Sequence, residues 1–156
     1  MAVKAIPEGY YTVTPYMIVR DAARAIEFYK QAFGAEELMR LPSPNERVGH
    51  AELQIGNSRI MLADEFPEMG IKSPQTLGGS AMSILLYVED SDAMFQRAVD
   101  AGAKILKPIQ DQFYGDRSGT LTDPFGHQWT IGTHTEDVSN DELSRRMEAM
   151  FKKKSS

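Results

Sequence analysis

The chain has 156 residues, of which 42% are hydrophobic and 25% charged, a balance typical of a globular domain that buries its own core. It contains no cysteine, which excludes disulfides, thiolate metal sites and cysteine nucleophiles. The formal net charge of -5 disfavours a broad nucleic-acid-binding surface, and no apolar run reaches the length of a membrane span. Because the start also lacks a signal-peptide core, we expect a cytoplasmic protein without nucleic-acid or membrane partners.

The first half of the chain predicts a strand, a helix and three further strands. An apolar strand over Tyr16 to Val19 precedes a helical stretch from Ala22 to Phe33. Asp21 is placed to cap the free N–H groups at the helix start, and Gly34 to end the helix in a left-handed conformation. The three strands expected to follow are Glu36 to Arg40, Val48 to Ile55 and Ser58 to Ala63, with Gly56-Asn57 as a hairpin turn.

The second half repeats this plan. A strand over Ile84 to Val88 and Asp90 precede a helix from Ser91 to Ala101, which Gly102 ends. The strands expected after it are Lys104 to Lys107, Arg117 to Thr122 and His127 to Thr133. The sequence therefore predicts an α+β fold with two tandem βαβββ modules, at about 11–64 and 81–134, and a linker over 65–80. Together they should form one domain over 1–138, with a curved, cup-shaped sheet and the helices outside it.

A separate helix and tail are predicted over residues 139–156. Ser139 and Glu142 form the S-x-x-E pattern of a capping box. One face of this helix is apolar and consists of Leu143, Met147, Met150 and Phe151. That face has to be covered by the same chain or by a second copy, and we expect docking on the same chain.

The βαβββ repeat and the segments "VRDAARAIEFYKQAFGAE" and "DQFYGDRSGTLTDPFGHQWTIGTHTEDVS" resemble the vicinal oxygen chelate superfamily. This superfamily includes glyoxalase I, extradiol dioxygenases, fosfomycin-resistance enzymes and bleomycin-binding proteins. The resemblance runs from about Tyr11 to Val138 and is strongest to the PhnB-like branch, which is uncharacterised. It implies a cup built from both modules that holds a ligand, and a homodimer.

The resemblance also implies where the metal ligands of the superfamily's enzymes would lie. The matching positions in this chain are Thr14, Met61, Ser83 and Thr130. Three hydroxyls and a thioether hold divalent transition metals poorly, so we expect no metal and no other cofactor at these positions. The alternative is a displaced metal site formed by His50, Glu52 and His134.

Strand alternation identifies candidate site residues on the cup side. If Ala51, Leu53 and Ile55 face the helix, then His50 and Glu52 face the cup, where they could act as a general acid/base pair. By the same alternation, Trp129 belongs to the core. The expected ligand-binding residues are Tyr16, His50, Glu52, Arg59, Met61, Tyr87, Phe113, Tyr114 and Thr130.

Two functions remain open, and the sequence does not decide whether the chain is an enzyme. The first is metal-free binding of a small molecule, as in sequestration of an antibiotic or an aromatic metabolite. The alternative is a lyase, isomerase or dioxygenase that uses a displaced metal or the His50/Glu52 pair. An interaction module acting through the C-terminal helix is a third possibility. Arg59 and Arg117 could attract an anionic ligand, although surface salt bridges are the commoner role of such arginines.

Overall fold

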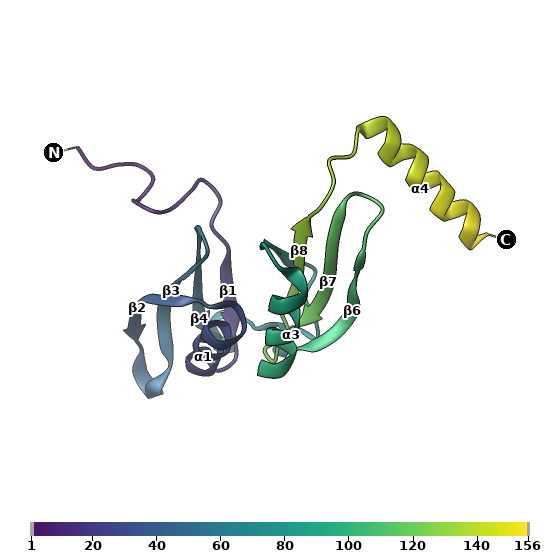
Figure 1. The fold of residues 1–156 in the computed structure, drawn as a ribbon. Helices are drawn as coiled ribbons and strands as arrows, with labels where there is room; N and C mark the ends of the chain where they lie inside the picture. Colours follow the sequence, from purple (N-terminus) through teal and green to yellow (C-terminus); the bar gives the residue numbers. More distant parts are fainter. Residues whose placement is uncertain (1, 156) are drawn as a thin grey trace.

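The structure, a computed structural model, describes residues 2–155, so residues 1 and 156 at the ends of the predicted domain and tail lie outside the described part. It confirms two modules with the same element order (Figure 1). Module one consists of β1 (Tyr16–Val19), α1 (Ala22–Phe33), β2 (Glu36–Pro42), β3 (Val48–Ile55) and β4 (Ser58–Asp64). Module two consists of β5 (Ser83–Tyr87), α3 (Ser91–Ala101), β6 (Lys104–Asp111), β7 (Asp116–Thr122) and β8 (Gln128–His134).

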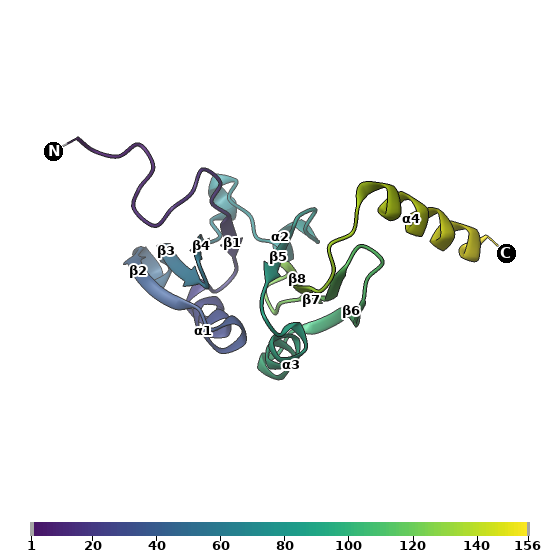
Figure 2. The same cartoon turned by 45° about the horizontal axis from the view of Figure 1, so that its top comes forward.

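The strand order is β1-β4-β3-β2 in module one and β5-β8-β7-β6 in module two. In each module the first strand pairs in parallel with the last, and the other pairs are antiparallel. The described strands form two four-stranded hydrogen-bonded sheets, one in each module, which confirms the predicted pair of modules with a curved sheet (Figure 2). β1 and β5, the first strands of the two modules, are not hydrogen-bonded to each other. α1 and α3 pack together on one side of the sheets, and we call the opposite side the cup face (Figure 1).

The residues at the helix ends explain where α1 and α3 begin and stop. The side chain of Asp21 accepts a hydrogen bond from the backbone N–H of Arg24, and Asp90 caps α3 in the same way. Gly34 follows α1 in the left-handed conformation, at φ 67° and ψ 29°, where a side chain would be strained. The predicted caps are therefore confirmed, and they fix the helix that each sheet packs against.

A buried carboxylate ties the two modules together. Asp123, in the turn between β7 and β8, accepts hydrogen bonds from the hydroxyl of Tyr29 on α1 at 2.6 Å and from the indole N–H of Trp129 at 2.9 Å. It also accepts the backbone N–H groups of Phe125 and His127. Burial raises the pKa of Tyr29 well above its ordinary value, so the phenol stays a neutral donor. Trp129 is fully buried, which confirms its predicted place in the core.

The segment between the modules has more structure than the predicted linker. It contains the short helices η2 (Pro67–Met69) and α2 (Pro74–Leu77). Glu65 holds the segment, because its carboxylate accepts from the hydroxyl of Thr76 at 2.6 Å and from the backbone N–H of Ser73 at 2.9 Å. These contacts fix the path of the chain from β4 to β5.

The C-terminal helix α4 (Asn140–Lys154) projects away from both modules (Figure 1). No residue of α4 is buried, and the exposed fractions of Met147, Met150 and Phe151 are 47%, 40% and 65%. The expectation that this apolar face docks on the same chain is therefore wrong. The helix is attached instead through Arg146, which donates to the carbonyl of Phe113. The homodimer stays a prediction.

Among residues 2–155, every helix is too short or too polar to cross a membrane.

Candidate functional site

The cup face of module one carries a row of half-buried polar side chains. Along β3, Ala51, Leu53 and Ile55 are buried against the helix side, whereas His50 and Glu52 are only partly covered. In the sheet register, Tyr16 lies opposite Met61, and Met61 lies opposite Glu52. The alternation predicted from the sequence therefore places these candidate residues on one surface.

A hydrogen-bonded chain links three of them. The hydroxyl of Tyr16 lies 2.9 Å from Nδ1 of His50, and Nε2 of His50 lies 3.5 Å from a carboxylate oxygen of Glu52. A neutral imidazole that donates from Nε2 to Glu52 can accept from the phenol at Nδ1. Burial raises the pKa of Tyr16, so the phenol keeps its proton at neutral pH. Tyr16 thus supplies the third partner that the sequence alone did not connect to His50 and Glu52.

The chain before β1 covers one end of this row. Arg59 of β4 donates from Nη1 to the carbonyl of Glu8 at 3.0 Å and from Nε to the side chain of Gln54 at 2.9 Å. Its guanidinium lies over the ring of Tyr10, 5.1 Å from the ring centroid. Gly9 adopts φ +82° in contact with the guanidinium, where a Cβ atom would collide with Arg59. A side chain at this position would displace the segment.

Tyr10 is a candidate site residue that the sequence analysis did not select. Its hydroxyl is buried and makes no hydrogen bond within the described residues. Burial, and to a smaller extent the nearby carboxylate of Glu52, raises the pKa of Tyr10 to about 12. Tyr10 belongs to no strand or helix, so no periodic pattern marks it. Only the contact with Arg59 reveals its position.

A cavity lies between this N-terminal segment, β4 and β5. Most of its wall is apolar, and Arg59 is its only charged lining residue. Of the nine predicted ligand-binding residues, Arg59 alone lines it. The complete lining consists of Tyr10, Tyr11, Val13, Thr14, Pro15, Ile55, Ser58, Arg59, Ile60, Ile84, Leu85 and Leu86. Both modules therefore contribute to the cavity.

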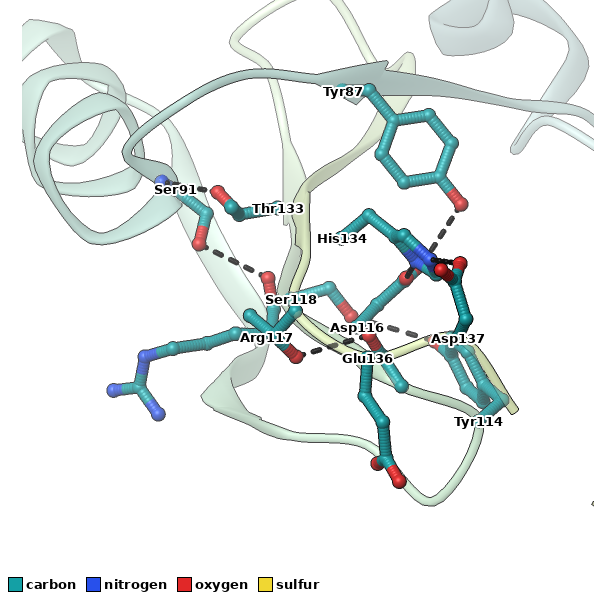
Figure 3. A network of polar contacts seen from close by, with 12 residues as sticks. Tyr87, Ser91, Tyr114, Asp116, Arg117, Ser118, Thr133, His134, Glu136 and Asp137 are labelled. Carbon is teal, nitrogen blue, oxygen red and sulfur yellow. Dashed lines mark hydrogen bonds and ion pairs between the residues drawn. The ribbon is translucent and has the colours of Figure 1, made fainter.

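Module two carries a second polar cluster on its cup face (Figure 3). Asp116 is almost fully buried and accepts from the hydroxyl of Tyr87 at 2.8 Å. His134 lies with Nδ1 2.8 Å from Asp116 and with Nε2 2.8 Å from Asp137. Because only the imidazolium can donate from both nitrogens, this arrangement favours the charged form of His134.

His134 should make stability depend on pH. The hydrogen bond to Asp116 and, to a smaller extent, the one to Asp137 raise the pKa of His134 above the ordinary value of 6.5. The stabilisation is therefore fully present below pH 6.5 and is lost as the pH rises through the higher folded pKa. We expect the melting temperature of the wild type to fall over that range by more than that of His134→Gln. Equal falls in both proteins, measured by thermal unfolding, would contradict this assignment.

The remaining predicted residues lie in module two. Phe113 and Tyr114 form the turn between β6 and β7, with their rings edge to face at 5.2 Å. The hydroxyl of Tyr114 lies 3.4 Å from that of Ser118, and Thr130 pairs with Thr120 at 3.0 Å. The structure thus divides the candidates into two groups. Module one carries Tyr16, His50, Glu52, Arg59 and Met61, and module two carries Tyr87, Phe113, Tyr114 and Thr130.

The residues at the implied metal positions do not fit a transition metal. The donors offered there are the hydroxyls of Thr14, Ser83 and Thr130 and the thioether of Met61. The alternative site from His50, Glu52 and His134 is wrong, because His134 belongs to the module-two cluster with Asp116. Within residues 2–155, no three His, Asp or Glu side chains come together in a way that could hold a metal ion.

Known proteins show the same sequence pattern and fold. A sequence model of the Glyoxalase/Bleomycin resistance protein/Dioxygenase superfamily matches residues 11–131. The uncharacterised Mycobacterium bovis protein Mb0911c is 46% identical over 138 residues, which cover 86% of this chain and 91% of that protein. The structure of TioX from Micromonospora sp. ML1 is 27% identical with a TM-score of 0.63, covering 80% of this chain and 98% of TioX. The Arabidopsis thaliana At5g48480 structure is 29% identical with a TM-score of 0.63, covering 81% and 99%.

Proposed function

The chain belongs to the glyoxalase/bleomycin resistance protein/dioxygenase superfamily, and on that premise we propose that it binds a small apolar or aromatic molecule on its cup face. The observation that carries the proposal is the cavity between the N-terminal segment, β4 and β5. Leu85 lines this cavity and shares the exposed face of β5 with Tyr87, whose side chain is 63% exposed. Apolar burial contributes roughly 25 cal/mol per Å², so these walls supply affinity while a few polar groups orient the ligand.

Sequestration of an antibiotic or an aromatic metabolite is the biological role that we propose for this binding. A ligand that binds only the folded chain raises its stability by mass action, by about 2.7 kcal/mol at a hundred times Kd. A thermal-shift screen of aromatic compounds should therefore yield hits. Saturable stabilisation by such compounds supports the proposal, and a screen in which none stabilises the chain argues against it.

Binding should not require a transition metal. The chain offers hydroxyls and a thioether at the implied metal positions, a donor set that holds nickel, zinc, iron and manganese weakly. We expect elemental analysis of protein purified without chelator to give far less than one such metal per chain. One equivalent of metal that is lost in Met61→Ala or Thr130→Ala would contradict this prediction.

A second candidate function is proton transfer, as in a lyase or an isomerase. It is favoured by the chain of contacts from Tyr16 through His50 to Glu52, because a carboxylate that orients an imidazole prepares it to act as a general base. A dioxygenase would need a redox metal or cofactor, and the donor sets on the cup face do not fit a metal. The two functions differ in their sensitivity to substitution: binding should depend most on Tyr87, and turnover most on Glu52.

A further inference from the structure

We infer that the ligand of the cavity between the N-terminal segment, β4 and β5 carries a carboxylate on an apolar or aromatic body, and that Arg59 binds this carboxylate. The inference rests on the proposed binding function and adds the chemical class of the ligand. It follows from the charge balance of the arginines, the geometry of Arg59 and the composition of the cavity wall.

Arg59 is one of two arginines that have no carboxylate at ion-pair distance within residues 2–155, and the other is Arg97. Arg97 donates to two carbonyls at the C-terminal end of α1, where the helix dipole is negative. The remaining arginines all lie within 4.0 Å of a carboxylate, and they are Arg20, Arg24, Arg40, Arg47, Arg117, Arg145 and Arg146. Within residues 2–155, no carboxylate lies at ion-pair distance from Arg59, whose hydrogen bonds go to neutral oxygens.

The guanidinium of Arg59 is nevertheless held in a fixed position. Its Nε atom bonds the side chain of Gln54, its Nη1 atom bonds the carbonyl of Glu8, and its plane lies over the ring of Tyr10. Nη2 makes no hydrogen bond to a described residue. An anion should bind this guanidinium more tightly than it binds a mobile surface arginine, because the side chain of Arg59 is already oriented and loses little conformational entropy on binding.

The rest of the cavity wall defines the rest of the ligand. Around Arg59 the lining is dominated by Val13, Pro15, Ile84 and Leu86, together with the rings of two tyrosines. No acidic side chain lines the cavity to repel an anion. One positive group in an otherwise apolar wall matches a molecule with one negative group and an apolar body.

The test compares acids with their uncharged amides on the full-length chain. The probes are phenylacetate with phenylacetamide and 2-naphthylacetate with 2-naphthylacetamide, titrated by calorimetry. We expect the wild type to bind each acid at least tenfold more tightly than its amide, since charge-assisted hydrogen bonds are stronger than hydrogen bonds between neutral groups. Arg59→Gln should abolish this preference, and Arg59→Lys, which keeps the charge, should retain part of it.

Arg117→Gln is the matched control. Asp92 and Asp111 already neutralise Arg117, so its substitution should leave the ratio of the two affinities unchanged. If acid and amide bind the wild type equally, the inference is wrong and the proposed binding function stands. If neither member of either pair binds, both are wrong. If Arg59→Gln fails to fold, the comparison of acid and amide on the wild type still decides whether the ligand carries a carboxylate.

Discussion

Replacing Asp123 with alanine should lower the free energy of unfolding by roughly 2–6 kcal/mol, because buried hydrogen-bond donors would lose their partner. Asp123 is 4% exposed and accepts four hydrogen bonds, two of them from backbone N–H groups. Its loss leaves the hydroxyl of Tyr29 and the indole N–H of Trp129 buried without a partner. Each such group costs about 1–3 kcal/mol.

The measurement is urea unfolding of the wild type, Asp123→Ala and two comparison variants. Tyr29→Phe removes one hydrogen-bond donor, and the carboxylate of Asp123 keeps its other three. We therefore expect the free energy of unfolding to fall by about 1 kcal/mol. Glu89→Ala serves as the surface control, because this exposed carboxylate makes no hydrogen bond or ion pair within residues 2–155, and its removal should change the free energy of unfolding by less than about 0.5 kcal/mol. A loss at Asp123→Ala no larger than that of the surface control would show that Asp123 does not hold the modules together.

Truncating Tyr87 to alanine should weaken ligand binding about tenfold or more, which corresponds to roughly 1.4 kcal/mol. Tyr87 is 63% exposed on the cup face at the end of β5, the strand that also lines the cavity, so a ligand that extends over the ring buries apolar area on binding. Tyr87→Phe is the matched control: it loses the hydrogen bond to Asp116 but keeps the ring, and should bind within a few-fold of the wild type. Titration of a screening hit measures all three affinities.

Glu52→Gln separates binding from catalysis. For a binding protein, this substitution should change affinity less than Tyr87→Ala does, because Glu52 contributes little apolar area. For an acid/base enzyme, it should leave affinity nearly unchanged and reduce turnover by a factor of about 10²–10⁴. A binding loss larger in Glu52→Gln than in Tyr87→Ala would contradict the proposal that aromatic area carries the affinity.

Most of the fold could be predicted because local signals and the repeat agree. The module helices α1 and α3 have the predicted ends, since Asp and Gly caps mark them directly. β6 runs to Asp111, beyond the predicted end at Lys107. The sequence did not indicate this extension, because Pro108 argues against a strand, yet an edge strand whose pairing with β7 is irregular tolerates it. The lack of hydrogen bonds between β1 and β5 could not be predicted, since a sequence pattern indicates which face of a strand is buried but not which strand it pairs with.

The site was predictable only where it lies on regular strands. Alternation placed His50 and Glu52 on the cup face, because the side chains of a strand point to opposite sides in turn. The same rule says nothing about Tyr10, which lies in an irregular segment and is positioned by a contact with Arg59, 49 residues later in the chain. Likewise, the sequence indicated that the apolar face of α4 needs a partner but did not identify it, and within residues 2–155 no other element buries this face.

Ligand binding on the cup face is tested most directly by photo-crosslinking. A diazirine derivative of a screening hit is bound to chelator-treated protein, irradiated, and the labelled peptides are identified by mass spectrometry. We expect labelling of the N-terminal segment around Tyr10 and of β5 around Leu85, which line the same cavity, and competition by the unmodified hit. Labelling confined to α4, or binding that disappears when metal is removed, would contradict a metal-free binding site on the cup face.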